Sequence, residues 1–263
     1  MTIDGKTIVI TRNKKESNEF ISSMLNKNAI PFSLPTIKII KKDQIVEKFI
    51  SVIKKHDPDF SVFMSATAVK LLFSEAKNIS KYNQLQLAIA NTIVVAVGPK
   101  TKFALENENI KVFRVPDKYS SVGLGEIFTK LDASGKKVII PRSSASNQFL
   151  SILLSKIGLC VKESYIYDII PFHDIKIWTK FYNLFKQDKI HGIIFTSSSS
   201  VRSFFEILQM YCSDKIIKSK LKTIKIVAIG PTTSNELNKF NVTNTLSKYY
   251  TISGAIETMY DVL

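Results

Sequence analysis

The chain has 263 residues, of which 45% are hydrophobic, 22% charged and 10% aromatic. These values are ordinary for a globular protein and exclude a wholly disordered chain, while the length allows one large domain or two small ones. The 37 lysines and arginines outnumber the 22 acidic residues, which gives a net charge of +15 and favours an anionic ligand or partner.

Short β-branched apolar runs alternate with helical patterns along the whole chain. Strands are predicted at 7–11, 30–34, 60–64, 92–97, 110–115, 137–141, 159–166, 191–196, 223–229 and 241–246. Helices are predicted at 14–27, 43–55, 67–77, 99–107, 121–131, 144–157, 174–186, 199–211, 232–239 and 252–262. This alternation indicates parallel sheets with helices on both faces, an α/β fold.

The two halves of the chain resemble each other at a nearly constant spacing. The matching pairs are IVITRN at 8–13 with VIIPRS at 138–143, VFMSATAVK at 62–70 with IFTSSSSVR at 194–202, VVAVGPKTKFAL at 94–105 with VAIGPTTSNEL at 227–237, and KYSSVGL at 118–124 with YYTISGA at 249–255. Their order is the same and their offsets are 130 to 132 residues. Chance matches would not keep a common offset, so we predict two α/β domains from a duplicated half of about 130 residues.

Polar turns follow matching strands in the two halves. They contain Ser65, Ala66 and Thr67; Lys100 and Thr101; Thr196, Ser197, Ser198 and Ser199; and Pro231, Thr232 and Thr233. Each turn enters a predicted helix, whose free N–H groups and positive dipole attract carboxylates or phosphates. Ligands of doubly wound sheets bind outside the carboxyl ends of the strands, so the turns predict an anion-binding cleft. The alternative is an ordinary set of helix N-caps, which any α/β protein uses.

Other polar candidates lie at the ends of strands. Arg12 and Arg142 occupy matching positions, where each could clamp a carboxylate or pair with a neighbouring acid. Ser143 follows Arg142, but no G-x-S-x-G sequence marks it as a nucleophile. Tyr165 and Tyr167 are two residues apart, so in a regular strand they share one face, either in half-buried packing or with a phenol facing the cleft.

Several classes of site are not supported by the residues. There is no Walker A or G-x-G-x-x-G sequence for a nucleotide cofactor, and Cys160, Cys212 and three scattered histidines suggest no metal site. Only four of the 37 basic residues are arginines, which disfavours specific nucleic-acid binding and leaves a lysine-rich solvated surface as the simplest account of the charge. No signal peptide or run of 18 apolar residues is found, so we expect a cytoplasmic protein without membrane contact.

The ordered set of motifs resembles the uroporphyrinogen-III synthase family over the whole chain. The residues that carry the resemblance are VITR at 9–12, FMSATAV at 63–69, VGPKT at 97–101, YIY at 165–167, FTSSSSVR at 195–202, IGPTT at 229–233 and YTISG at 250–254. Two positions depart from the family pattern, with Met64 where Thr is usual and Asn13 where Pro is common.

The resemblance implies a fold and a domain arrangement that periodicity alone does not show. Two flavodoxin-like domains would be joined by a two-stranded linker, with a cleft between them. One domain would be discontinuous and the other inserted, with boundaries at 1–35 plus 171–263, at 40–165, and at 36–39 and 166–170 for the linker strands.

The resemblance also implies an activity. The enzyme, a carbon–oxygen hydro-lyase, would close the linear tetrapyrrole hydroxymethylbilane to uroporphyrinogen III, with loss of water and inversion of ring D, on the route to haem, sirohaem and cobalamin. It would act as a monomer without a metal or an organic cofactor. Tyr167 aligns with the family's cleft tyrosine and would be the catalytic residue, while the polar turns, Arg12, Arg142 and Ser143 would bind substrate.

Two other classes of protein remain as alternatives to this enzyme. A two-domain solute-binding protein would share the duplicated layout and bind an anion without turnover, but it would usually carry an export signal. A nucleic-acid-binding protein would use the +15 charge, but it would need clustered arginines and exposed aromatic residues.

Overall fold

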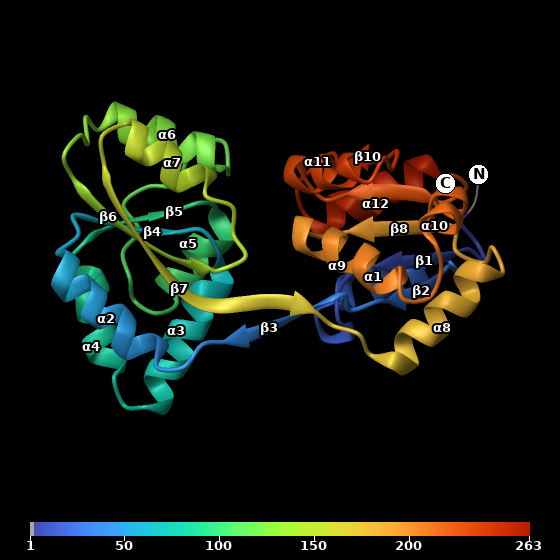
Figure 1. Cartoon of the computed structure of the whole chain (residues 1–263), viewed down its shortest axis with the longest axis horizontal. Helices are drawn as coiled ribbons and strands as arrows, with labels where there is room; N and C mark the ends of the chain where they lie inside the picture. Colours follow the sequence, from blue (N-terminus) through green and yellow to red (C-terminus); the bar gives the residue numbers. More distant parts are fainter. Residues whose placement is uncertain (1–2) are drawn as a thin grey trace. The chain divides into compact units, whose positions relative to one another are not determined.

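Two five-stranded sheets organise residues 3–263, the part of the chain that the computed structural model describes. The chain divides into two units (Figure 1). Unit 1 combines the chain up to Lys38 with Ile170–Leu263, and unit 2 is Ile39–Ile169. Each unit has one parallel-dominated sheet with helices on both faces, which confirms the predicted α/β class.

The sheet of unit 1 has the strand order β10-β9-β8-β1-β2, and every neighbouring pair is parallel. Its strands are β1 (Thr7–Ile10), β2 (Ile30–Ser33), β8 (Gly192–Phe195), β9 (Lys225–Ala228) and β10 (Thr245–Leu246). Its helices are η1 (Lys14–Glu16), α1 (Asn18–Leu25), α8 (Ile175–Lys186), α9 (Ser198–Leu208), α10 (Asp214–Leu221), α11 (Pro231–Lys239) and α12 (Ile252–Val262).

Alternate side chains of the unit 1 strands enter two different cores. Ile8 and Ile194 pack with α1 and α12, whereas Val9 and Ile193 pack with α8, α9, α10 and α11. All four side chains are fully buried. Continuous apolar runs are what a parallel sheet covered on both faces requires, and this explains why the strands were recognisable in the sequence.

The sheet of unit 2 has the order β3-β7-β6-β4-β5, with parallel pairing from β7 through β5. Its strands are β3 (Ile37–Lys41), β4 (Phe60–Phe63), β5 (Ile93–Ala96), β6 (Lys137–Ser143) and β7 (Cys160–Pro171). Its helices are α2 (Ile45–His56), α3 (Ala66–Asn78), α4 (Tyr82–Ala90), α5 (Pro99–Glu106), α6 (Ser121–Lys130) and α7 (Phe149–Lys156).

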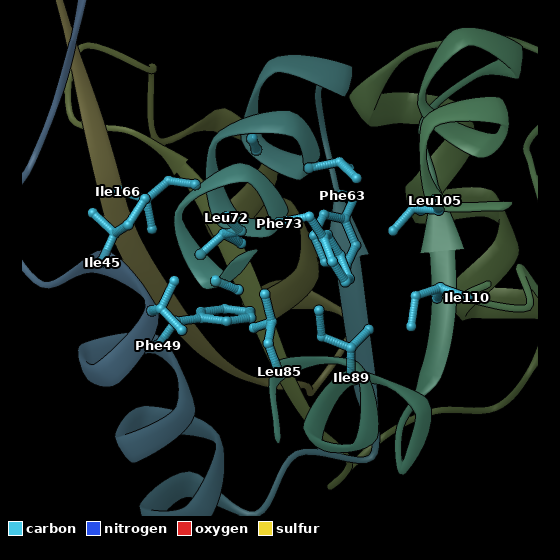
Figure 2. Close-up of a cluster of buried hydrophobic side chains, with 14 of the residues drawn as sticks. Ile45, Phe49, Phe63, Leu72, Phe73, Leu85, Ile89, Leu105, Ile110 and Ile166 are labelled. Carbon is cyan, nitrogen blue, oxygen red and sulfur yellow. The ribbon is translucent and has the colours of Figure 1, made fainter. Parts of the chain in front are cut away.

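The helices of unit 2 divide between the two faces of its sheet in the same way as those of unit 1. One core joins α6 and α7 to the sheet, and the other joins α2, α3, α4 and α5 to it. Figure 2 shows part of the second core, where Phe49 of α2, Phe73 of α3 and Ile89 of α4 pack on one face of the sheet. The duplicated sequence therefore folds into two units built to one plan.

β3 and β7 carry the chain from one unit to the other, and their arrows point in opposite directions (Figure 1). They are neighbours in the sheet of unit 2, and beyond the end of β3 the N–H of Lys42 donates to the carbonyl of Ile166 at 3.1 Å. β7 is one unbroken strand from Cys160 to Pro171, longer than the strand predicted at 159–166.

The structure differs from the sequence prediction at three further places. The strand expected at 110–115 is reduced to one bridge between Arg114 and Val95. The helices α4 and α10 were not predicted, because each is short and buries only two side chains, four residues apart. Such a pattern is too brief to separate a helix from a connecting loop.

Candidate functional site

Hydroxyl groups join the carboxyl ends of β1 and β8 in unit 1. The buried Thr11, which follows β1, accepts a hydrogen bond on Oγ1 from the N–H of Thr196 at 3.1 Å. Thr196 returns the contact by donating its hydroxyl to the carbonyl of Thr11 at 3.2 Å. Thr11 was not predicted as a site residue, although the repeated IVITRN segment contains it.

Ser197 begins α9 with a reciprocal capping arrangement. Its Oγ accepts from the N–H of Ser200 at 3.0 Å, and Oγ of Ser200 accepts from the N–H of Ser197 at 3.1 Å. These bonds explain why the helix starts here. The hydroxyl of Ser198 donates to the carbonyl of Thr232 at 2.9 Å and so brings the first turns of α9 and α11 together.

α11 starts without a side-chain cap. Gly230 is its N-cap residue, Pro231 is its first residue, and Thr232 is exposed, whereas Thr233 is buried. Glycine offers no side-chain oxygen to cap the helix and Pro231 has no N–H, while the N–H of Thr233 donates to the carbonyl of Gly230 at 3.1 Å. The N–H of Thr232 is therefore left for solvent or a ligand. Ser199 is half-buried at the neighbouring α9 terminus.

The same pair of helix starts occurs in unit 2. Ser65 caps α3 and accepts from the N–H of Ala68 at 3.1 Å, and Ala66 and Thr67 form the half-buried first turn. α5 starts at Gly98 without a side-chain cap. The strands before these two helices, β4 and β5, are paired in parallel, so both helix starts lie at one edge of the sheet. The first turn of α5 contains an exposed Lys100 and a buried Thr101.

Tyr167 lies at this edge with its side chain almost entirely buried, at 6% exposure. Its hydroxyl is 3.3 Å from Oγ of Ser65. Tyr165 is instead 46% exposed, and its hydroxyl donates to Oε2 of Glu163 at 2.5 Å. The two tyrosines therefore do not share one environment, contrary to the expectation from a regular strand.

An irregularity in the pairing of β6 with β7 accounts for this difference. Arg142 is opposite Tyr165, whereas the next residue, Ser143, is opposite Tyr167. One residue of β7 is thus skipped, and both Ile166 and Tyr167 are buried in the same core. A bulge of this kind re-aims side chains and is not visible in an alternating sequence pattern.

Arg142 pairs with a neighbouring acid, Glu163, which is one of the two roles considered for it. Its buried guanidinium lies 2.6 Å from Oε1 of Glu163 and donates to the carbonyl of Asn147 at 2.8 Å. Burial raises the pKa of Glu163, but hydrogen bonds from Ser151 and Tyr165 and the charge of Arg142 outweigh it, so the pKa lies below its ordinary value.

The remaining predicted residues have looser or purely local contacts. Nε of Arg12 is 3.6 Å from Oε2 of Glu16, and both side chains are partly exposed. Ser143 is buried, and its Oγ accepts from the N–H of Ala145 at 3.2 Å. Within residues 3–263, Arg12 is therefore the predicted arginine whose guanidinium is more accessible to a ligand.

A polar cluster next to Tyr167 was missed in the sequence. The N–H of Ser144 donates to the carbonyl of Tyr167 at 3.1 Å, and the Ser144 hydroxyl bonds to the carboxylate of Asp168. Nζ of Lys42 is 3.0 Å from the same carboxylate. The hydrogen bond from Ser144, followed by that from Lys42, lowers the pKa of Asp168. The three residues of the cluster, Lys42, Ser144 and Asp168, are far apart in the sequence, so no local motif predicts the cluster.

Among residues 3–263, no group of three or more His, Cys, Asp or Glu side chains is arranged to hold a metal ion. In the same part of the chain no helix is long and apolar enough to cross a membrane.

Comparison with known proteins identifies relatives over almost the whole chain. The family model described as uroporphyrinogen-III synthase HemD matches residues 19–257. A relative from Methanothermobacter thermautotrophicus, provisionally assigned as a uroporphyrinogen-III synthase, is 24% identical over 250 residues, which cover 95% of each chain. The uroporphyrinogen-III synthase of Synechococcus elongatus is 23% identical over 236 residues, covering 88% of this chain and 84% of the relative.

Solved structures show the same fold. A crystal structure of a mutant uroporphyrinogen III synthase from Thermus thermophilus matches with a TM-score of 0.69 at 15% identity, covering 98% of both chains. The structure of uroporphyrinogen-III synthetase from Helicobacter pylori matches with a TM-score of 0.65 at 16% identity, covering 98% of this chain and all of the other.

Proposed function

Since the chain belongs to the uroporphyrinogen-III synthase family, we propose that it closes hydroxymethylbilane to uroporphyrinogen III, with loss of water and inversion of ring D. The observation that carries the proposal is the Tyr167 phenol set against the capped start of α3, at an edge that also has an uncapped helix start. Family membership favours this enzyme over the solute-binding and nucleic-acid-binding alternatives.

The substrate carries eight carboxylates, and the helix starts are suited to bind them. α5 and α11 begin at Gly98 and Gly230 without a side-chain cap, which leaves the N–H groups of Lys100 and Thr232 for an anion. The hydroxyls of Thr67 and Thr232 add donors at the same edges. The net charge of +15 would draw the polyanion in from solution.

Tyr167 is proposed to assist the departure of the substrate's hydroxyl group. Loss of this hydroxyl breaks a carbon–oxygen bond and leaves a delocalised azafulvenium cation. A phenol that donates a proton or a hydrogen bond to the leaving oxygen lowers the barrier. Burial and the contact with Ser65 hold the Tyr167 hydroxyl in one place, which is the requirement for such a donor.

The larger task is to select isomer III. The cation must be attacked by the substituted carbon of ring D, which gives a spiro intermediate, before the free position of ring D closes directly to isomer I. Binding carboxylates at many separate main-chain sites fixes the rings relative to one another and so favours one mode of closure. In this scheme, catalysis is mostly positioning, with acid assistance from one phenol.

The decisive experiment incubates the protein with freshly generated hydroxymethylbilane and separates isomers I and III by chromatography. We expect isomer III in excess, whereas a buffer control gives isomer I. Isomer I alone at every protein concentration would contradict the proposal. The reaction would make the protein a carbon–oxygen hydro-lyase, and we further propose that it acts as a cytoplasmic monomer without a metal or organic cofactor.

A further inference from the structure

Two exposed tyrosines occupy equivalent positions in the two units. Tyr119 is 60% exposed and Tyr250 is 59% exposed. An added Cβ on Gly98 would meet Cγ of Tyr119 at 3.4 Å, and one on Gly230 would meet Cγ of Tyr250 at 3.9 Å. The base of each phenol ring therefore packs against the N-cap glycine of α5 or α11, neither of which has a side-chain cap. The rest of the ring is exposed to solvent.

The chain holds both tyrosines with the same tight turn. In unit 2 the N–H of Ser120 donates to the carbonyl of Lys118 at 2.7 Å, and Ser120 then caps α6. In unit 1 the N–H of Thr251 donates to the carbonyl of Tyr249 at 2.6 Å, and Thr251 then caps α12. The residue in the middle of each turn is the exposed tyrosine.

A glycine in the following helix keeps this turn closed. A Cβ on Gly123 would lie 2.2 Å from the carbonyl oxygen of Lys118, and one on Gly254 would lie 2.4 Å from that of Tyr249. Both distances are far below any tolerable contact, so only glycine allows the turn to pack so closely. These turns lie in the repeated segments at 118–124 and 249–255, which have no role in the proposed function.

The surroundings of Tyr119 suit a ring that carries acidic groups. It lines a groove of about 610 Å³ together with Phe113, Arg114 and Lys102. The guanidinium of Arg114 lies 5.3 Å from the centre of the Phe113 ring. Aromatic rings and basic side chains therefore line the same groove of unit 2, next to the first turn of α5.

We propose that Tyr119 and Tyr250 each bind the face of one pyrrole ring of the substrate. This inference rests on the proposed function and names the part of the protein that binds the rings, since carboxylate binding alone leaves them without a contact. A pyrrole is flat and rich in electrons, and it packs on a phenol in an edge-to-face or offset arrangement.

The test compares alanine and phenylalanine variants at both tyrosines in the full-length protein. Tyr119→Ala and Tyr250→Ala should each raise KM for hydroxymethylbilane and weaken anaerobic binding of uroporphyrinogen III by about tenfold. Tyr119→Phe and Tyr250→Phe keep the ring and should bind nearly as the unaltered protein does. Tyr249→Ala and Phe103→Ala remove equally exposed rings, at 64% and 65%, and should change neither value.

Each outcome decides the matter. Unchanged KM and product binding in both alanine variants would overturn the inference while isomer III formation keeps the proposed function intact. If the phenylalanine variants lost as much substrate and product affinity as the alanine variants, the hydroxyl and not the ring would be the group that contacts the ligand. That result would also overturn the inference. If an alanine variant loses its thermal transition, the leucine variant at that position replaces it, and normal affinity there contradicts ring binding. Failure of the unaltered protein to form isomer III would instead remove the proposed function, and with it the basis of this inference.

Discussion

The hydroxyl of Tyr167 lies 3.3 Å from Oγ of Ser65, so one phenol on β7 contacts the serine that caps α3. Ser65 also accepts from the N–H of Ala68 at 3.1 Å. A change at either residue therefore reaches the start of the helix and the position of the phenol together. The contact is the structural basis of the first two predictions.

Tyr167→Phe should slow formation of isomer III by about 10²- to 10⁴-fold, the usual contribution of a positioned general acid. The substrate's carboxylates would still be bound, so KM should change little. Loss of the hydrogen bond to Ser65 should lower the free energy of unfolding by about 1 kcal/mol. Steady-state kinetics and urea unfolding measure the two effects separately.

Tyr165→Phe is the matched control, because this tyrosine is on the same strand but exposed, with its hydroxyl bonded to Glu163. Its turnover should stay within about threefold of the unaltered protein. A correctly folded Tyr167→Phe variant with normal turnover would remove Tyr167 from the mechanism and leave positioning as the whole account.

Ser65→Ala and Ser197→Ala should each lower the free energy of unfolding by about 0.5–2 kcal/mol, since each removes the cap of a helix. Their effects on turnover should differ, because only Ser65 contacts Tyr167. We expect Ser65→Ala to slow the reaction several-fold, and the double variant with Tyr167→Phe to be no slower than Tyr167→Phe alone. Fully additive losses in rate would show that the contact has no part in catalysis.

Gly98→Ser and Gly230→Ser should raise KM for the substrate by about two- to fivefold, because a new hydroxyl would compete for the N–H of Lys100 or Thr232 that an anion would use. Both glycines have extended backbones that any residue can adopt. Stability should therefore change by only a few tenths of a kcal/mol. Gly98→Ala and Gly230→Ala add the same bulk without the hydroxyl, and an equal rise in KM in these variants would argue against competition for the N–H groups.

Glu163→Gln should lower the free energy of unfolding at pH 7 by about 3 kcal/mol, because it leaves the buried guanidinium of Arg142 without its counter-charge. The pKa of Glu163 is lower in the folded protein than in the unfolded chain. The stabilisation is therefore present above the ordinary carboxyl pKa and disappears as the pH falls through the lowered one.

Urea unfolding at pH 7 and at about pH 3 should show the difference between Glu163→Gln and the unaltered protein shrinking at the acidic pH. Glu106→Gln is the control, since Oε1 of Glu106 lies 3.7 Å from Nζ of Lys102 and both side chains are about half exposed. Its effect should stay within about 0.5 kcal/mol. A pH-independent loss in Glu163→Gln would contradict the ion-pair account.

The repeated motifs predicted the fold and the placement of the polar turns, because those at 62–70, 94–105, 194–202 and 227–237 each join a largely buried strand to a helix start. Ser65 and Ser197 are N-caps in both units, and Gly98 and Gly230 begin the next helices. Such features depend on neighbours within three or four residues, which is the range over which sequence patterns are informative.

The parts that were missed depend on contacts between distant segments. The bulge that separates the environments of Tyr165 and Tyr167 arises from the register of β6 on β7. The cluster around Asp168 needs Lys42 and Ser144, which only the folded sheet brings together. The repeat likewise showed that Tyr119 and Tyr250 correspond, but not that each ring starts against an N-cap glycine.

Because unit 1 is discontinuous in the sequence, its sheet can be completed only after unit 2 has been synthesised. Its central strands β1 and β8 pair Ile8 with Gly192, 184 residues later, and all of unit 2 is made between them. At about 5–20 residues per second, β1 would wait about 10–40 seconds on the ribosome for this partner. Unit 2 is one continuous stretch and can complete its sheet within that interval. The apolar β1, with an unpaired edge, is then the segment of the nascent chain most in need of a chaperone.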